Sequence, residues 1–219
     1  HLERAHGVAL RFSTPVHHID LPRIHTPRDT WTVERAIVCS GADFESLYPD
    51  IFADSGLTRC KLQMLRTAPQ PDDWRLGPML AGGLTLRHYT AFKECQSLAA
   101  YARRITAEHP EFDDWGIHVM ASQNGRGEIT IGDSHEYGWS IDPFDKPEID
   151  RWILDYLQTF LAAPSLHIAQ RWHGIYAKHP DRADFIADPA PGVKIVNGVS
   201  GAGMTTAFGL AEEVFAAWE

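Results

Sequence analysis

Apolar and polar side chains alternate along the chain in short runs, and each run predicts one element of secondary structure. Apolar residues at every second position predict strands, while apolar residues three or four positions apart predict helices. The predicted strands lie at 8–19, 24–26, 30–32, within 33–43, and at 58–67, 84–89, 116–122, 128–135, 168–176 and 193–196. The predicted helices lie at 44–48, 92–109, 147–162, and from the 201–205 turn to the chain end. Asn124-Gly125 is a pair that tight hairpin turns favour, so it is expected to join 116–122 to 128–135.

The last thirty residues predict a strand, a glycine-rich turn and a helix. Gly198, Gly201 and Gly203 lie in the turn, where glycine allows a positive φ or the close approach of a ligand. The start of the helix offers unpaired N–H groups with a partial positive charge, which suits an anionic or electron-rich group. The turn matches neither the Walker P-loop nor Gly-x-Ser-x-Gly, nor the dinucleotide motif Gly-x-Gly-x-x-Gly. A turn that only packs the helix onto a sheet is the alternative.

Composition and charge limit the partners. The 219 residues carry 20 Lys and Arg against 29 Asp and Glu, a net charge of −9 without a basic block, so nucleic acid is not expected. The chain has no apolar stretch of about eighteen residues, which predicts no membrane span. Cys39, Cys60 and Cys95 form no Cys-x-x-Cys pair and are expected to be reduced thiols in a cytoplasmic protein. No His-Glu-x-x-His spacing occurs, so no metal site is predicted.

Four segments resemble the D-amino-acid oxidase-like superfamily of FAD-dependent amine oxidoreductases, which includes glycine and sarcosine oxidases. Residues 16–19 resemble the strand that lies over the adenine, and 36–42 resemble the apolar strand that ends in small residues and glycine. Residues 176–181 resemble the stretch that faces the substrate, and 198–205 resemble the turn that holds the pyrimidine edge of the flavin. The resemblance implies FAD as the cofactor.

A narrower resemblance is to the FAD-dependent oxidoreductases associated with phosphonate catabolism. The segments 57–64, 116–119, 131–138 and 172–180 carry it. It implies oxidation of the C–N bond of a 2-aminoethylphosphonate-type amine, with N-methylated compounds favoured. A hydride would pass to flavin N5, and the imine would hydrolyse to an aldehyde. The resemblance leaves dioxygen open as the electron acceptor.

The resemblance also implies a domain organisation. Residues 1–56 and 185–219 are expected to be parts of the FAD-binding domain, and 57–184 a substrate-binding antiparallel sheet with covering helices. The N-terminal unit with Gly-x-Gly-x-x-Gly, which binds the FAD pyrophosphate, has no counterpart in the sequence, and the first residue is His1. We therefore expect an α/β (α+β) fold that is the C-terminal portion of a D-amino-acid oxidase-like flavoprotein, with an incomplete Rossmann-type unit.

Two other functions stay open at this point. One is a sarcosine-, glycine- or D-amino-acid-type oxidase that acts on a carboxylate substrate. The other is a non-catalytic fragment that lacks the nucleotide-binding unit.

The resemblance assigns one set of residues to the flavin. N–H groups at the start of the last helix would face the negative charge that reduction leaves near flavin N1 and O2. Gly174 lies near the position where some relatives attach the flavin through cysteine, so covalent attachment is not expected there. The expected cofactor-binding residues are Val16, Ser40, Gly41, Ala42, Gly174, Gly198, Gly201, Gly203, Met204 and Thr205.

A second set is assigned to the substrate. Histidine takes up protons near neutral pH, which suits an ammonium group, although a structural role is the alternative for each histidine. Arg and Lys suit the oxygens of a phosphonate, with a solvated strand position as the alternative. Tyr176 stands where many relatives place an Arg that grips a carboxylate, so that grip is not expected here. The expected catalytic residues are Tyr176, Lys178, His135 and His118, and the expected substrate-binding residues are Arg59, Lys61, Gln63, Arg66 and His179.

Overall fold

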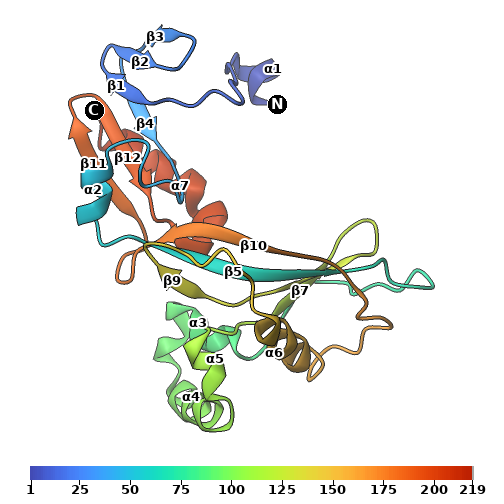
Figure 1. The fold of residues 1–219 in the computed structure, drawn as a ribbon. Coiled ribbons are helices and arrows are strands. Elements are labelled where there is room, and N and C mark those ends of the chain that lie inside the picture. Colours follow the sequence, from blue (N-terminus) through green and yellow to red (C-terminus); the bar gives the residue numbers. More distant parts are fainter. Residues whose placement is uncertain (219) are drawn as a thin grey trace. The chain divides into compact units, whose positions relative to one another are not determined.

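The computed structural model describes residues 1–218, apart from the side chain of Thr90, and divides the chain into two compact units (Figure 1). Unit 1 comprises His1–Thr58 and Ala177–Glu219, and unit 2 comprises Arg59–Tyr176. Both units contain strands and helices, which confirms the expected mixed α/β class.

Unit 1 contains two small sheets. The first is antiparallel, with β1 (His18–Asp20), β2 (Arg23–His25) and β3 (Thr30–Thr32) in that order. In the second sheet, β12 (Val193–Asn197) lies between β11 (Phe185–Ala190), which is antiparallel to it, and β4 (Ala36–Val38), which is parallel to it. The predicted strands at 24–26, 30–32 and 193–196 are thereby confirmed.

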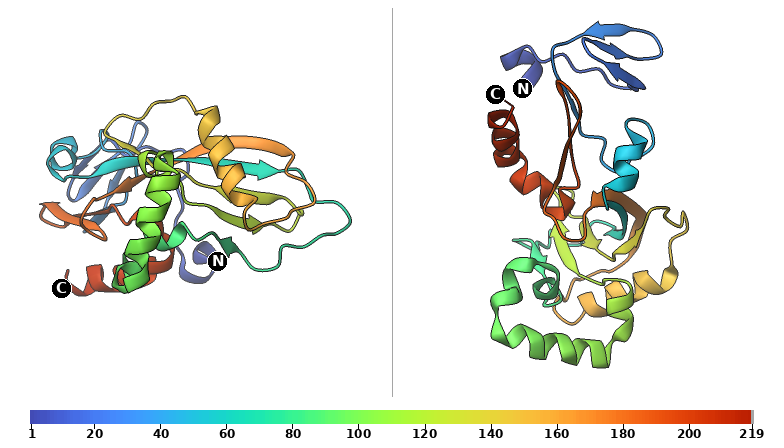
Figure 2. Two further views of the ribbon diagram at one scale, coloured as in Figure 1. Left: turned by 90° about the horizontal axis from the view of Figure 1, so that it is seen from below. Right: turned by 90° about the vertical axis from the view of Figure 1, so that its left-hand side faces the viewer.

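Helices and a compact apolar core complete unit 1. The helices are α1 (Leu2–His6), α2 (Pro49–Asp54), the short 3-10 helix η2 (Ser200–Ala202) and α7 (Gly203–Ala216). Figure 2 shows α7 running beside the β11–β12 hairpin. Burial of apolar area is the main force that holds these short elements together. The core consists of Ala36, Val38, Phe44, Phe52, Leu57, Ala177, Phe185, Val193 and Ile195.

Unit 2 is built on a six-stranded sheet with the order β10-β5-β8-β7-β6, in which β9 also pairs with β5. Its strands are β5 (Thr58–Thr67), β6 (Leu80–Ala81), β7 (Met120–Gln123), β8 (Ile129–Gly132), β9 (Glu136–Gly138) and β10 (Ile168–Lys178). Its helices are α3 (Thr85–His88), η1 (Thr90–Glu94), α4 (Gln96–Glu108), α5 (Pro110–Asp114) and α6 (Pro147–Leu157). Figures 1 and 2 show these helices on one side of the sheet.

Strand alternation gives the sheet of unit 2 two different faces. Along β5, Lys61, Gln63 and Leu65 are buried, while Leu62 and Met64 between them are partly exposed. Successive side chains of a strand point to opposite faces, so the odd positions form a face that packs against the helices. The even positions belong to the opposite face, since the helices of unit 2 all lie on one side of its sheet in Figure 1.

The structure corrects the predicted strand at 84–89, which is the helix α3 (Thr85–His88). Leu84 and Thr85 are both buried, whereas Leu86 is 42% exposed, so burial here does not follow a period of two. The preceding Gly82 packs so closely that a Cβ there would come within 2.7 Å of the Tyr156 ring. Tertiary packing rather than local alternation therefore decides this segment.

Residues 8–17 form no strand, although a strand was predicted over 8–19. Only His18–Asp20 pair, and Phe12 is 80% exposed. Alternation alone is not sufficient, because a strand also needs a neighbour for its backbone hydrogen bonds.

Several helix limits also differ from the prediction. The helix expected at 44–48 begins instead at Pro49, because Tyr48 takes the left-handed conformation with φ 56°. The helix expected at 92–109 is divided into η1 and α4, and the one expected at 147–162 ends at Leu157. Alternation gave no indication of α1, α5, β6, β9 or β11.

Candidate cofactor and substrate sites

A cleft of about 490 Å³ lies along β4 in unit 1. Its lining includes Val16 from the segment before β1, the β4 residues, and Ser40 just after β4. The volume falls within the roughly 300–1,000 Å³ typical of small-molecule sites. The structure thus brings Val16 and Ser40 together in one cleft, although they are more than twenty positions apart in the chain. The resemblance assigned both residues to the cofactor.

The turn after β4 is tied to the end of β12. The side-chain amide of Asn197 donates to the carbonyl oxygen of Gly41 at 3.0 Å and to the Ser40 hydroxyl at 3.3 Å. Because β4 and β12 are parallel, their carboxyl ends lie at the same edge of the sheet. In open α/β sheets, that edge is where ligands bind. Gly41 has φ +60°, and a Cβ at this position would have no neighbour within 4 Å, so a ligand has access to its backbone. Ala42 follows Gly41 in the turn.

The local structure alone explains why position 198 is a glycine. Its φ is +66°, and a Cβ there would lie 2.6 Å from Leu57 Cδ2. Both the left-handed conformation and the tight packing require glycine at this position, whether or not a cofactor is bound.

The start of α7 is open to solvent. Met204 is 94% exposed, and a Cβ at Gly201 would have no neighbour within 4 Å, whereas one at Gly203 would meet Val199 at 2.6 Å. Thr205 lines a second cleft of unit 1, of about 410 Å³. The first N–H groups of a helix have no partner within the helix, so this exposed start is available to an electron-rich group.

The last helix leaves most of its large apolar side chains exposed. Val214 is buried, while Phe215 is 52% and Phe208 85% exposed. The sequence pattern therefore predicts the helix correctly, but its apolar residues do not form a buried face.

In unit 2, the buried thiol of Cys60 lies between two tyrosines. Cys60 pairs with Tyr137 across β5 and β9, and the hydroxyls of Tyr137 and Tyr176 both hydrogen-bond with its sulfur. Burial raises the pKa of both phenols well above the usual range, and Cys60 and then the Asp133 carboxylate add to the effect. Both tyrosines are therefore neutral hydrogen-bonding groups over the physiological pH range.

The two predicted catalytic histidines share one carboxylate. His118 Nδ1 lies 3.1 Å and His135 Nδ1 3.8 Å from Asp133 Oδ1, and His135 Nδ1 also lies 2.9 Å from the carbonyl oxygen of Gly116. All three residues are at most 9% exposed. The ring of His88 stacks on both histidines with centroid distances of 4.4 Å. The His135 ring in turn lies 6.1 Å from the Tyr137 ring, so the histidine cluster and the tyrosine pair form one continuous group.

Lys61 and Gln63, which were expected to bind substrate, point to the helix-covered face. Lys61 Nζ donates to the carbonyl oxygens of Asp142 and Phe144 at 2.8 and 2.6 Å, and lies 3.0 Å from Asp145 Oδ1. The Gln63 amide donates to the Lys146 carbonyl oxygen and to Asp150 Oδ1, both at 3.0 Å. These contacts hold the 142–150 segment and explain both side chains without a substrate.

The two predicted arginines lie beside aromatic rings. Arg59 donates to the Trp139 carbonyl oxygen and lies over the Trp139 ring at 5.8 Å. Arg66 lies over the Trp172 ring at 5.1 Å and donates to Gln170 Oε1 at 3.2 Å. Arg66 is six positions beyond Cys60 on β5, roughly 20 Å at the usual rise per residue. A small substrate beside Cys60 would therefore not reach Arg66.

The remaining predicted residues lie at or near the end of β10. Gly174 is in the strand with open space around a Cβ, Lys178 is its last residue, and the Lys178 backbone bridges to Val199. His179 Nδ1 accepts from the backbone N–H groups of Asp181 and Arg182, both at 3.0 Å, which gives it a turn-forming role.

Sequence reasoning missed four members of these sites. Asn197, Cys60 and Tyr137 act through partners that are distant in the chain, such as Gly41 for Asn197, whereas Asp133 acts through His118 and the nearby His135. Asp133 carried a usable signal, since 131–138 belongs to the resemblance to the phosphonate-associated oxidoreductases.

Two features of residues 1–218 bear on partners. No described helix is long and apolar enough to cross a membrane. Over the same residues, no group of three or more His, Cys, Asp or Glu side chains is arranged to hold a metal ion.

Comparison with protein families identifies the chain. The model of the family described as FAD dependent oxidoreductase (DAO) matches residues 2–217. The chain belongs to this family. No curated protein matches it.

Solved structures show the same fold. The chain is similar to L-proline dehydrogenase from P. horikoshii (TM-score 0.59, 19% identity), glycine oxidase from Bacillus cereus ATCC 14579 (0.57, 13%) and fructosamine oxidase from Aspergillus fumigatus (0.53, 16%). The matches cover 89%, 87% and 89% of this chain, but 46%, 45% and 42% of those chains. The chain therefore spans less than half the length of these relatives. The D-amino-acid oxidase-like flavoprotein fold expected from the sequence is confirmed.

The residues of unit 1 fit part of an FAD molecule. The β4 cleft has the volume for a nucleoside, and Gly41 leaves its backbone accessible beside it. The exposed start of α7 provides N–H donors that suit the electron-rich edge of a flavin. When bound, FAD would supply the two-electron acceptor of the reaction.

Proposed function

We propose that the protein is a cytoplasmic FAD-dependent oxidoreductase that deaminates a small aminophosphonate, with N-methylated 2-aminoethylphosphonate-type compounds favoured. Membership of the FAD dependent oxidoreductase family supports the cofactor and the reaction class. The observation that carries the proposal for this chain is the β4 cleft, which unites Val16 and Ser40 from two segments of the expected FAD site.

In this proposal the two parts of the chain have different tasks. Residues 1–56 and 185–219 bind FAD, through Val16, the 40–42 turn and the start of α7. Residues 57–184 bind the amine. The parallel pair β4 and β12 and the largely antiparallel sheet of unit 2 support this division.

The substrate residues are assigned by chemistry. The neutral hydroxyls of Tyr137 and Tyr176 orient the substrate, and Lys178 provides a point charge for the phosphonate. His135 and His118 hold the proton that the ammonium group loses before oxidation. Asp133 supports this role because its Oδ1 lies 3.1 Å from His118 Nδ1 and 3.8 Å from His135 Nδ1 and orients both rings.

A carboxylate substrate is the second candidate. The solved relatives named above include a glycine oxidase and an L-proline dehydrogenase, both named for amino acids. Against it, Tyr176 is hydrogen-bonded to Cys60 at the position where the resemblance places a carboxylate-gripping Arg.

The decisive experiment compares 2-aminoethylphosphonate with β-alanine, which has the same carbon chain and a carboxylate. The purified protein is loaded with FAD, and bleaching of the flavin absorbance is followed without oxygen, with the N-methyl derivatives of both amines included. Faster bleaching by the phosphonates is expected. Equal or faster bleaching by the carboxylates would favour the second candidate, and no bleaching by any amine would overturn the oxidoreductase proposal. Repetition in air shows whether dioxygen accepts the electrons.

A further inference from the structure

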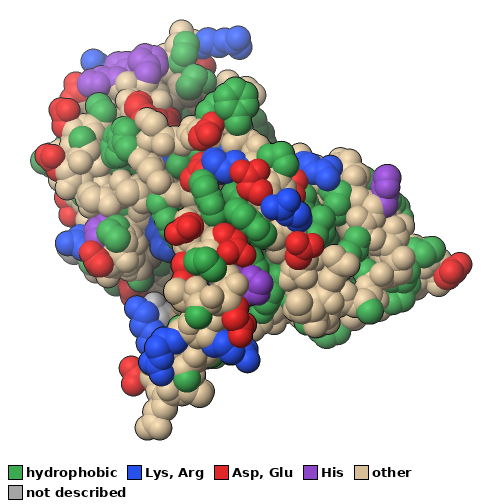
Figure 3. All heavy atoms as spheres, turned by 60° about the horizontal axis from the view of Figure 1, so that its bottom comes forward, with side chains coloured by type: hydrophobic (Ala, Val, Ile, Leu, Met, Phe, Trp, Pro, Cys, Tyr) green, Lys and Arg blue, Asp and Glu red, His purple; other side chains and the backbone are tan. Residues whose placement is uncertain are grey.

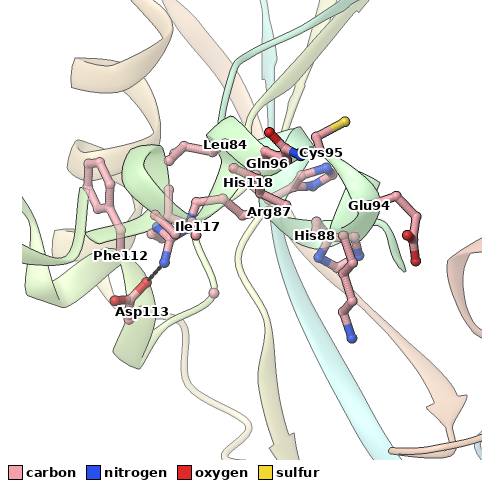
Figure 4. A pocket seen from close by; sticks show the side chains of 15 residues that line it. Leu84, Arg87, His88, Glu94, Cys95, Gln96, Phe112, Asp113, Ile117 and His118 are labelled. Carbon is pink, nitrogen blue, oxygen red and sulfur yellow. Dashed lines mark hydrogen bonds and ion pairs between the residues drawn. The ribbon is translucent and has the colours of Figure 1, made fainter. Parts of the chain in front are cut away.

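A cleft in unit 2, separate from the two clefts of unit 1, has features of a ligand site and includes His118 in its lining. It has a volume of about 690 Å³ and is formed by α3, η1, α4 and α5 with the segment that precedes β7. Figure 4 shows His118 and His88 together in this cleft, with Arg87 bonded to Asp113 at one side. Leu98, Ala99, Ala102, Phe112 and Ile117 provide an apolar lining.

His118 presents an unused hydrogen-bonding atom in this cleft. The residue is 3% exposed, and among the described residues its Nε2 has no hydrogen-bond partner. Buried polar atoms are almost always satisfied, so this ring nitrogen of a residue in the wall of the cleft offers a hydrogen-bonding position to a ligand. The contact of Asp133 with the other ring nitrogen, Nδ1, determines which hydrogen-bonding group the ligand must provide.

Asp133 fixes the tautomer of His118. A carboxylate only accepts hydrogen bonds, so the Nδ1 that lies 3.1 Å from Asp133 Oδ1 carries the hydrogen. In the neutral ring, Nε2 then holds the lone pair and accepts a hydrogen bond. The ligand must therefore donate an N–H or O–H group to this nitrogen.

The charges around the cleft favour a cation. The lining contains two cations, Arg87 and Lys93, and two anions, Glu94 and Asp113, which balance. The acidic side chain of Asp133, which lies behind His118, adds one formal negative charge to this balance, and both residues are buried. Weak screening inside the protein makes a positive donor preferable to a neutral one.

We propose that this cleft binds a small organic ammonium ion, whose N–H group donates to His118 Nε2 and whose apolar body lies on the α4–α5 lining. The inference agrees with the proposed function in naming an amine. Its test needs no flavin, so each of the two proposals can fail alone.

The test uses three probes with one aromatic body: benzylammonium, benzyl alcohol and benzoate. Binding to the purified protein is measured by calorimetry and by chemical-shift changes of the histidine ring protons. Benzylammonium is expected to bind at least tenfold more tightly than the alcohol, and benzoate more weakly than both. Equal binding of all three probes, or tighter binding of benzoate, would overturn the proposal.

Matched variants locate the site. Ala99 lines the cleft, while the neighbouring exposed Ala100 on α4 does not. Ala99→Trp is expected to abolish binding of benzylammonium, and Ala100→Trp to leave it within twofold of the parent. If both variants keep the circular dichroism spectrum of the parent and lose benzylammonium binding equally, the ligand does not bind in this cleft.

Two further variants test the chemistry. His118→Gln is expected to weaken benzylammonium at least tenfold, and Asp133→Asn to remove the preference for benzylammonium over benzyl alcohol. A preference that survives in Asp133→Asn would show that the negative charge comes from elsewhere and would overturn the assignment.

Discussion

Asn197 holds Gly41 across a gap of 156 positions in the sequence, with its side-chain amide 3.0 Å from the Gly41 carbonyl oxygen. The same amide reaches the Ser40 hydroxyl at 3.3 Å, so a single side chain sets the turn beside the β4 cleft. Asn197→Asp replaces the donor with an oxygen that repels the carbonyl. We expect unfolding free energy to fall by about 1–3 kcal/mol, and FAD affinity by at least tenfold, measured by quenching of flavin fluorescence. Unchanged affinity together with lower stability would leave the turn a purely structural role.

Gly198 and Gly201 are expected to respond differently to the same change. Gly198→Ala places a methyl group 2.6 Å from Leu57 Cδ2 at a positive φ, so we expect a loss of about 1–3 kcal/mol in thermal unfolding. Gly201→Ala meets no atom within 4 Å and serves as the matched control. A loss of FAD affinity in Gly201→Ala at unchanged stability would support the flavin role of the α7 start. Equal destabilisation by both changes would contradict the explanation from Leu57.

Lys61 is expected to stabilise the fold rather than bind substrate. Lys61→Met removes three contacts and leaves the Asp145 carboxylate without its buried partner. Because Asp145 remains partly exposed, we expect a loss of about 3 kcal/mol, near the lower end for a broken buried pair, in denaturant unfolding. The control is Arg75→Met, since Arg75 and Asp73 form an exposed pair whose removal should change stability by less than about 0.5 kcal/mol. A similarly small effect of Lys61→Met would show that the segment 142–145 does not depend on it.

The tyrosines predict a loss of stability at alkaline pH. The pKa values of Tyr176 and Tyr137 are raised by burial and by Cys60, and burial with the Tyr156 hydrogen bond raises the pKa of Tyr101 to about 12. Above the ordinary tyrosine pKa of about 10, the unfolded chain loses these protons while the folded chain keeps them. The unfolded state then binds fewer protons, so stability is fully present below pH 10 and falls as pH rises above it.

Absorbance at 295 nm checks this prediction directly. At pH 11 the folded protein should show fewer ionised phenols than the same protein in urea, and Tyr176→Phe should remove one of the late-titrating groups. Identical titrations of the folded and unfolded protein would contradict the burial of these side chains.

The sequence predicted most strands and helices of unit 2 because their patterns are long. Alternation over ten residues identified β5, and Asn124-Gly125 identified the β7–β8 hairpin. The pattern failed at α3, where glycine packing against the Tyr156 ring outweighs alternation. It also failed at 8–17, where no partner strand is provided.

The sequence predicted the chemical type of the site residues better than the direction in which their side chains point. Val16 and Ser40 were identified by resemblance and share one cleft. By contrast, Lys61 and Gln63 lie on the helix-covered face of β5 and contact the 142–150 segment, an orientation that alternation alone does not show. Asn197 could not be recognised, since its role depends on a contact with the distant turn at Gly41.

The stack of His88 on His118 and His135 provides a natural spectroscopic reporter. Each ring centroid lies 4.4 Å from that of His88, close enough for the magnetic field of one aromatic ring to shift the proton resonances of the next. The carbon-bound protons of His88 should therefore stand apart from those of the exposed histidines that gather over β1 and β2 in Figure 3, including His17 and His18. An event that tilts one of the three imidazoles will move a separate line in the proton spectrum, without a label or a cofactor.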